Sequence, residues 1–311
     1  MFNSLVLSTY NGARYVRDQL DSLVAQTLPF DEVLVSDDCS TDETAEIVRS
    51  CICERELNNW FLSVNPENRG WKRNFHDLIR RASGDYVFLC DQDDIWLPEK
   101  VACMVGVMET HSDIDLLACD VEPFYEEGSQ KLTDMRGTLC DCDGRIEAVQ
   151  VDNHAVYVQR PGCSYCVRGS FIGQVEPYWD ESWAHDAVLW MLAESKGSLA
   201  LYRKPLVRFR RHEGNASARK KMTREARTAD IRDLLSRVDK MEMFSRDLGC
   251  LTPEKEETLE NFRAWLDARE GLLESRRLDQ LGKVLSGHSR YVSTKGMLVD
   301  LILTLFRNAR L

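Results

Sequence analysis

The chain has 311 residues, of which 43% are hydrophobic and 29% are charged, and its formal net charge is −11. A chain of this size and composition is globular, with one large domain and an appendage or with two domains. The acidic balance argues against nonspecific binding to nucleic acid, so we expect no nucleic-acid partner.

Cysteine usage and hydropathy indicate a cytoplasmic protein. The 11 cysteines are an odd number spread along the chain, which suits reduced thiols better than a disulfide framework. The sequence starts without a basic leader or a cleavage site, and no apolar run reaches the length of a transmembrane helix. We therefore expect a cytoplasmic location, at the inner face of the membrane if the chain docks there.

Strand-like and helix-like segments alternate over residues 4–120, as in a parallel sheet covered by helices. Apolar residues at helical spacing predict a first helix over 16–24, and Ser40 with Glu43 three residues later predicts a capping box for a second helix. A third helix is expected over 71–81. The predicted strands are residues 4–8, 32–36, 60–64 and 86–90.

Three carboxylates follow the fourth predicted strand. Asp91, Asp93 and Asp94 come directly after an apolar run, and Pro98 starts a helix beyond them. The carboxyl ends of strands are where open α/β sheets bind ligands. Clustered carboxylates repel one another, and a divalent cation shared with a diphosphate relieves that repulsion. From these residues alone, a metal–diphosphate site and a solvated acidic turn with a helix cap both stay open.

Right-handed crossovers would bring the ends of all four strands to one edge of the sheet, as a nucleotide-sized set of polar groups. There an aromatic ring can cover a base, and carboxylates can accept from a base N–H or from ribose hydroxyls. Neither G-x-G-x-x-G nor G-x-x-x-x-G-K-[ST] occurs, which disfavours a Rossmann dehydrogenase and a P-loop NTPase. The residues concerned are Thr9 and Tyr10, Asp37 and Asp38, Asn68 and Arg69, and Asp91 and Asp93.

The segments STYNGARYV, SDDCSTDET, NPENRGWKRNF and CDQDDIWLPEK resemble the successive motifs of family-2 glycosyltransferases with the GT-A fold, over roughly the first 120 residues. DQDDIWLPEK, with HDAVLWMLA and RRHEGNAS further on, is similar to bacterial rhamnosyltransferase-like members that build surface polysaccharides. The resemblance implies an α/β fold with a Rossmann-like, mixed, mostly parallel sheet flanked by helices. It also implies inverting, metal-dependent transfer of rhamnose or another hexose from a dTDP- or UDP-sugar to a glycan or lipid-linked glycan.

The same resemblance implies roles for individual residues. Asp91 is expected on the ribose, and Asp93 is expected on a divalent metal, Mg²⁺ or Mn²⁺. The other substrate-binding residues that it implies are Thr9, Tyr10 and Asp38 around the base, Arg69 beside it, and Asn11, Lys72, Gln92, Gly162, Cys163 and His185.

Between residues 120 and 160 the periodicity fails, which predicts strand ends and a mobile acceptor-side loop. Gly162 and Cys163 then resemble the small-residue turn that approaches the bound sugar in the family, since a glycine without Cβ lets backbone come close to a ligand. A plain turn is the alternative.

A helix opens near Asp186 and stops at Gly197. A carboxylate at a helix start is favoured by the helix dipole, which is one reading of Asp186. The other is a general base, because inverting displacement needs the acceptor hydroxyl deprotonated on the face opposite the leaving diphosphate. The resemblance favours the base, and Asp180 and Glu181 are rivals for that role.

Residues 199–202 and 206–209 read as two strands of a hairpin, followed by Arg210, Arg211 and His212. The two arginines suit a diphosphate leaving group, or they are solvated surface charges. His212 is either a metal ligand, as the corresponding histidine of the family is, or a surface histidine.

From Arg224 onward the pattern is helical, so we divide the chain into a catalytic domain over 1–220 and a helical C-terminal region over 221–311. Within the catalytic domain, 1–120 would bind the nucleotide sugar and 121–220 the acceptor. The last apolar segment, 297–306, predicts either peripheral docking on a membrane or a helix that closes the core or forms a homodimer interface.

Two other functions were weighed against the transferase. A nucleotidyltransferase also carries acids at strand ends, but it would have a Gly-rich, basic loop near the first strand, where this chain has STYNGARYV. An inactive sugar-nucleotide-binding scaffold would have lost some acids, and Asp38, Asp91, Asp93 and Asp186 are all present.

Overall fold

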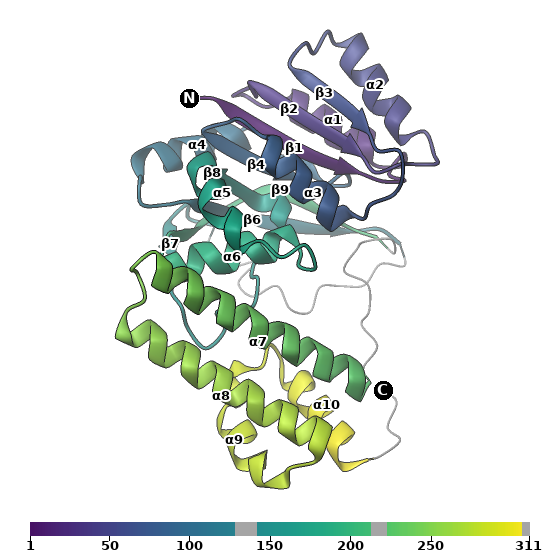
Figure 1. Ribbon diagram of the computed structural model, residues 1–311. Helices are drawn as coiled ribbons and strands as arrows, with labels where there is room; N and C mark the ends of the chain where they lie inside the picture. Colours follow the sequence, from purple (N-terminus) through teal and green to yellow (C-terminus); the bar gives the residue numbers. More distant parts are fainter. Residues whose placement is uncertain (128–141, 213–222, 307–311) are drawn as a thin grey trace.

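The computed structural model describes residues 1–127, 142–212 and 223–306. In these ranges one nine-stranded sheet carries helices on both faces, and a further layer of helices extends from one side (Figure 1). The sheet is the part of the molecule that positions the site.

The first half of the sheet is parallel and the second half is mixed. The strand order is β3-β2-β1-β4-β8-β6-β9-β5, with β7 paired to β9. Neighbours among β1, β2, β3 and β4 are parallel, so their carboxyl ends meet at one edge, as expected. β8 runs antiparallel between β4 and β6, and β9 runs parallel to β6. The strands are β1 (Asn3–Thr9), β2 (Glu32–Asp37), β3 (Trp60–Val64), β4 (Tyr86–Cys90), β5 (Ile95–Trp96), β6 (Leu116–Tyr125), β7 (Ile146–Ala148), β8 (Tyr165–Arg168) and β9 (Leu199–Arg211).

The central strands β1 and β4 are buried along their whole length because both faces of the sheet are covered. Val6 and Leu89 point to the face that is packed by α3 (Trp71–Arg81), α5 (Gly169–Val175) and α6 (His185–Lys196). Leu7 and Phe88 point to the opposite face. That face is packed by α1 (Val16–Val24), α2 (Thr44–Glu54) and α4 (Lys100–Thr110).

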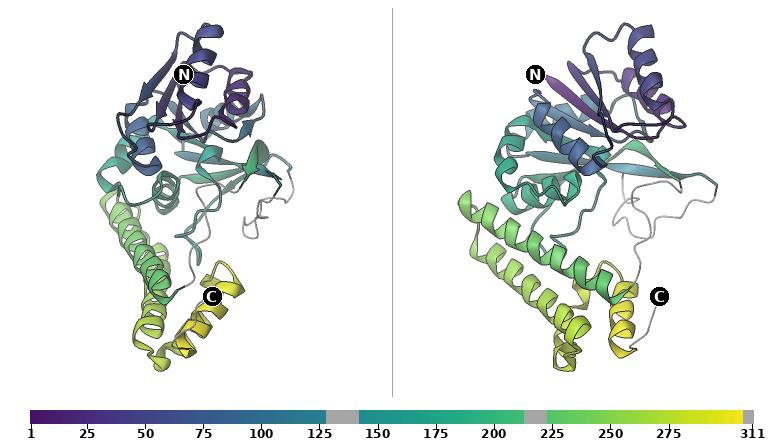
Figure 2. Two further views of the ribbon diagram at one scale, coloured as in Figure 1. Left: turned by 90° about the vertical axis from the view of Figure 1, so that its right-hand side faces the viewer. Right: turned by 45° about the vertical axis from the view of Figure 1, so that its right-hand side comes forward.

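The C-terminal helices continue one of these two cores. α7 (Arg224–Asp247) packs on α6, and α8 (Pro253–Ser275) lies alongside α7, as both views in Figure 2 show. α9 (Leu281–Ser286) and α10 (Thr294–Leu305) complete the layer, and no helix in the described ranges is both long and apolar enough to cross a membrane. The buried carboxylate of Asp300 in α10 accepts hydrogen bonds from Arg227, Arg269 and Tyr291 and so links several segments of this layer. Short 3-10 turns are η1 (Gly162–Ser164), η2 (Glu176–Tyr178), η3 (Leu278–Gln280) and η4 (His288–Arg290).

Two local predictions from the sequence are wrong. Helix α2 begins at Thr44 with Glu43 as its N-cap and no side-chain cap. Ser40 is not a capping residue, because its hydroxyl donates to Asp37 Oδ2 at 2.6 Å. The expected hairpin over 199–209 is one strand, β9, which stays parallel to β6 through a bulge beside Asp120.

The region after residue 120 is more regular than its sequence suggests. Strand β6 continues to Tyr125, and β7 occupies residues 146–148. The rest of the predicted acceptor-side loop includes residues 128–141, which lie outside the described ranges.

Candidate active site

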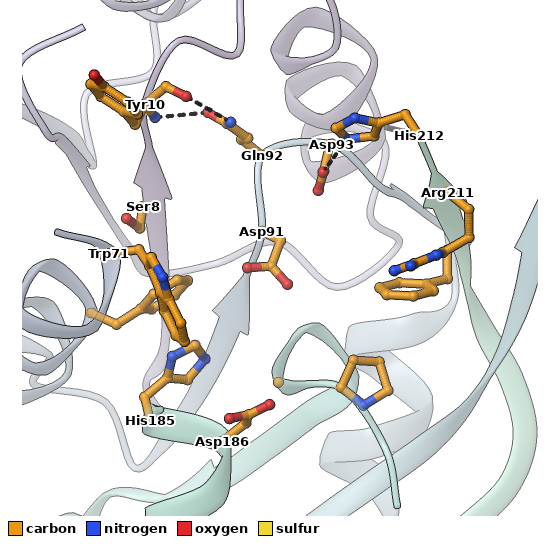
Figure 3. A pocket seen from close by; sticks show the side chains of 14 residues that line it. Ser8, Tyr10, Trp71, Asp91, Gln92, Asp93, His185, Asp186, Arg211 and His212 are labelled. Atoms are coloured by element: carbon orange, nitrogen blue, oxygen red, sulfur yellow. Dashed lines mark hydrogen bonds and ion pairs between the residues drawn. The ribbon is translucent and has the colours of Figure 1, made fainter. Parts of the chain in front are cut away.

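A pocket of about 400 Å³ opens at the carboxyl ends of β1 and β4, beside the start of α6 (Figure 3). Segments far apart in the sequence meet there: the β1 end, the loop after β4, the turn before β8, the start of α6 and the end of β9. Eight of the residues predicted to be functional line it, namely Tyr10, Asp91, Gln92, Asp93, Gly162, His185, Asp186 and His212.

The Gln92 amide fastens the loop after β4 to the end of β1. Tyr10 N–H donates to Gln92 Oε1 at 2.9 Å, and Gln92 Nε2 donates to the Tyr10 carbonyl at 3.0 Å. With its backbone held on both sides, Tyr10 keeps its ring 44% exposed at the pocket. An exposed ring on a fixed backbone can stack on a planar ligand without further ordering of the chain.

Asp93 and His212 form the pair most suited to a metal. His212 Nε2 lies 2.8 Å from Asp93 Oδ2, and both side chains are largely buried. A carboxylate and an imidazole are suitable ligands for Mn²⁺, and a cation held by two protein groups leaves positions for diphosphate oxygens and water. A metal held by both groups would replace the hydrogen bond between them. The donor set therefore fits a divalent cation.

A second group of potential ligands lies deeper. One oxygen each of Asp91 and Asp94 and the sulfur of Cys163 lie within 4.8 Å of one another. Asp94 Oδ1 accepts from Arg210 N–H at 2.9 Å. Because Asp94 is fully buried beneath the loop, we favour Asp93 and His212 as the pair that meets a ligand in the pocket.

The carboxyl groups of the loop after β4 lie close enough to change one another's pKa values. Burial, followed by the charges of Asp93 and Asp94, raises the pKa of Asp91 well above its usual value. Burial and the charge of Asp93 raise the pKa of Asp94 to about 7. The fully buried Lys100 offsets this in part, and its Nζ donates to the Cys163 carbonyl at 2.6 Å. A cation entering the pocket would relieve the remaining repulsion.

His185 and Asp186 begin helix α6, whose N-cap is Ala184. His185 is 4% exposed, and its ring stacks on Phe75 with ring centroids 3.9 Å apart. The Trp71 ring lies nearly perpendicular to it, with centroids 6.0 Å apart. Burial lowers the pKa of His185 to about 4, so the imidazole is neutral near neutral pH. Both ring nitrogens are buried, and neither has a hydrogen-bond partner among the described residues.

The glycine of the turn before β8 is required by close approach to this histidine. A Cβ on Gly162 would lie 2.5 Å from His185 Nε2, which is closer than atoms pack. Figure 3 places Asp186 across the pocket from the loop that carries Asp91 and Asp93, with His185 on one side and Arg211 on the other. The rival Asp180 instead accepts from the Ser182 hydroxyl and N–H within its own turn, outside the described lining.

Six predicted residues lie outside the described lining of this pocket, and their roles stay predictions. They have structural partners: Thr9 donates to Asp37, Asn11 accepts from Thr41 N–H, Asp38 accepts from the backbone of Arg69 and Gly70, Lys72 donates to the Ser182 carbonyl, and the Cys163 carbonyl accepts from Lys100. The sixth, Arg69, pairs with Asp77 and lines a different cavity beside α3.

The aromatic wall of the pocket was not predicted. Trp71, Phe75 and Phe209 line it together with the His185 ring. The position of Trp71, directly after Gly70 at the start of a helix that follows a polar strand end, was a usable signal. Phe75 reads as an ordinary core residue of its helix, and Phe209 as one of an alternating strand, so their sequence contexts carry no such signal.

Comparison with known proteins identifies relatives of this chain. A family model described as glycosyl transferase family 2 matches residues 4–171. The dTDP-rhamnosyl transferase RfbG of Shigella flexneri is 26% identical over 221 residues, which are 67% of this chain and 72% of RfbG.

Solved structures share the fold at low sequence identity. The poly(ribitol-phosphate) β-N-acetylglucosaminyltransferase TarS of Staphylococcus aureus, residues 1–349 with UDP-GlcNAc, superposes with a TM-score of 0.61 at 20% identity, covering 97% of this chain and 79% of that one. A mannosyltransferase of Pyrobaculum calidifontis with GDP-Man and Mn²⁺ gives a TM-score of 0.51 at 14% identity, covering 99% and 88%. The fold of the present chain is therefore GT-A.

Proposed function

The chain belongs to glycosyl transferase family 2, and we propose that it is an inverting, metal-dependent enzyme that moves a sugar from a nucleoside-diphosphate sugar to a glycan or lipid-linked glycan. The observation that carries the proposal is the composition of one pocket. It joins an exposed aromatic ring, a carboxylate–imidazole pair and a helix-start aspartate. These are the groups that a base, a metal-bound diphosphate and an acceptor hydroxyl each require.

The donor is proposed to be a dTDP- or UDP-sugar. RfbG, by its name, uses a dTDP-linked rhamnose, and the TarS structure holds UDP-GlcNAc. In this chain the Tyr10 ring would stack on the base, Asp91 would accept from the ribose, and Arg211, which points into the pocket from β9, would face the diphosphate (Figure 3). Rhamnose or another hexose would then lie beside the neutral His185 ring, which lines the pocket.

Asp93 and His212 are proposed to hold the divalent metal, Mg²⁺ or Mn²⁺. When bound, that cation would act as a Lewis acid that neutralises charge on the departing diphosphate. The two residues would fix its place at the β9 side of the pocket, and diphosphate oxygens and water would fill its other positions.

Asp186 is proposed as the general base. Its carboxylate lines the pocket from the first turn of α6, where the helix dipole favours the ionised form. From there it would accept the proton of the acceptor hydroxyl as that oxygen attacks the sugar opposite the diphosphate, which gives inversion. Gly162 packs closely against His185 and Asp186, so a side chain at this position would displace them.

We further propose a role in surface polysaccharide synthesis at the inner face of the membrane. Leu298, Leu305 and Phe306, in and directly after α10, are at least half exposed, and they would provide an apolar contact with a membrane surface. The alternative for the same side chains is a homodimer interface.

A donor screen tests the proposal. The protein is incubated with dTDP-rhamnose, UDP-GlcNAc and related nucleotide sugars with Mg²⁺ or Mn²⁺, and nucleoside diphosphate release is measured. We expect one donor to be turned over well above the others, with loss of turnover on chelation. No release from any donor, or full activity in chelator, would contradict the proposal.

A further inference from the structure

Arg210 is not a surface charge, although its sequence context allows one. Its side chain is 10% exposed and joins three segments. Nε donates to the Asp93 carbonyl at 2.8 Å, Nη2 to Asp18 of α1 at 2.8 Å, and Nη1 to Glu126 beyond β6 at 3.3 Å. Its backbone N–H also donates to Asp94. One guanidinium thus holds the backbone of the acidic loop at Asp93 itself.

The same group supports His212, two residues further along the chain. The Arg210 guanidinium lies over the rings of Tyr15 and Phe124, at 5.0 and 4.7 Å from their centroids. The Tyr15 ring packs on the His212 ring with centroids 4.5 Å apart, and its hydroxyl donates to Glu126 at 2.8 Å. The orientation of the His212 imidazole therefore depends on the same cluster that fixes Asp93.

We propose that Arg210 is a positioning residue that holds Asp93 and His212 at the separation a divalent metal requires. This inference rests on the proposed function, because it assumes that these two residues bind the cation. A guanidinium suits the task because its donors leave in fixed directions and reach three acceptors at once. Residues that hold metal ligands in place without binding the metal themselves change the affinity for the metal by about 10–100-fold when they are removed.

Charge alone makes the opposite prediction. A cation near the metal repels it, so removal of the Arg210 charge would tighten metal binding if electrostatics dominated. The neighbouring carboxylates of Asp18 and Glu126 already offset that charge. Arg210→Lys separates positioning from charge, because lysine keeps the positive charge but lacks the planar guanidinium with its several fixed donors.

Arg208 is the matched control. It lies two residues earlier on β9, and its guanidinium also covers the Phe124 ring, at 4.9 Å from the centroid. It is exposed, and its strand partner in β5 is Ile95. Arg208→Met thus removes the same group from the same strand at an exposed position.

The experiment is calorimetric titration of Mn²⁺ into the protein saturated with UDP or dTDP, for the wild type, Arg210→Met, Arg210→Lys and Arg208→Met. Affinity for the nucleotide without metal and the melting temperature are measured on the same samples. We expect about 10–100-fold weaker Mn²⁺ binding in both Arg210 variants and an unchanged value in Arg208→Met. Metal-free nucleotide affinity is expected to stay unchanged in all of them.

Asp18→Asn provides a test if the Arg210 variants do not fold. Its side chain is 55% exposed, so the protein is expected to fold, and the loss of one anchor of the guanidinium should weaken Mn²⁺ binding several-fold. Equal or tighter Mn²⁺ binding in Arg210→Met, recovery in Arg210→Lys, an equal loss in Arg208→Met, or no loss in Asp18→Asn would overturn the inference. A wild-type protein that binds no Mn²⁺ with either nucleotide would overturn the metal site itself, which separates the two failures.

Discussion

Acid should destabilise the protein through His185. This residue is 4% exposed beside Phe75 and Trp71, and burial lowers its pKa from 6.5 to about 4. Between these two pKa values the His185 imidazole is protonated in the unfolded chain and neutral in the folded chain. The contribution of His185 to the free energy of unfolding is at its highest above the unfolded pKa of 6.5. It decreases as the pH falls toward the folded pKa of about 4.

The size of this effect follows from the two pKa values. At about pH 5 the histidine is mostly protonated in the unfolded chain and mostly neutral in the folded one, which gives a loss of about 2 kcal/mol relative to pH 7.5. Asp91 and Asp94 act in the opposite direction, because their raised pKa values let the folded state take up protons first. The pH dependence of the wild-type free energy of unfolding would therefore report only the net effect of His185, Asp91 and Asp94.

Comparison with His185→Leu isolates the histidine. Urea unfolding of both proteins at about pH 7.5 and pH 5 should show the wild type losing about 2 kcal/mol more than the variant over this interval. NMR titration of the imidazole provides the direct value. Parallel pH dependence of the two proteins, or an imidazole that titrates near its usual pKa, would refute the reasoning.

Three further predictions concern the pocket. Asp93→Ala should abolish turnover and Mn²⁺ binding while the melting temperature is kept, and a fully active variant would contradict the metal assignment. Tyr10→Ala should weaken nucleoside diphosphate binding by about one to two orders of magnitude, since stacking contributes roughly 1–3 kcal/mol, and calorimetry measures this. Asp186→Asn should lower transfer by about 10²–10⁴ at unchanged nucleotide affinity. If Asp180→Asn or Glu181→Gln is inactive instead, the base lies before the helix.

The positions of β1 and β4 could be predicted because these two strands are buried on both faces. Each of β1 and β4 contains an apolar run, Leu5–Leu7 in β1 and Tyr86–Cys90 in β4, and the polar residues after these runs lead to Tyr10 and Asp91 at the strand ends. Parallel pairing then brings these ends together, and the pocket forms where they meet.

The failures have a common cause in contacts that local patterns do not contain. Ser40 has the spacing of a cap but bonds back to Asp37, a competing local hydrogen bond. The sequence of β9 resembles a hairpin because Pro205 interrupts its alternation of polar and apolar residues. In the structure β9 stays one strand because it pairs with β6 on both sides of a bulge. Arg210 looks solvated because its partners Asp18 and Glu126 are 192 and 84 residues away along the chain.

The central claim is that this pocket splits a nucleotide sugar between the diphosphate and the sugar. Phosphorus NMR of the protein with its preferred nucleotide sugar and Mg²⁺, which is diamagnetic, reports this bond directly. The account predicts that the donor signals are replaced by those of a nucleoside diphosphate, and that Asp93→Ala abolishes the change. Formation of nucleoside triphosphate and sugar 1-phosphate after addition of pyrophosphate would indicate a nucleotidyltransferase. Unchanged donor signals with every nucleotide sugar tested would indicate a binding scaffold, and either result would contradict the proposed transfer.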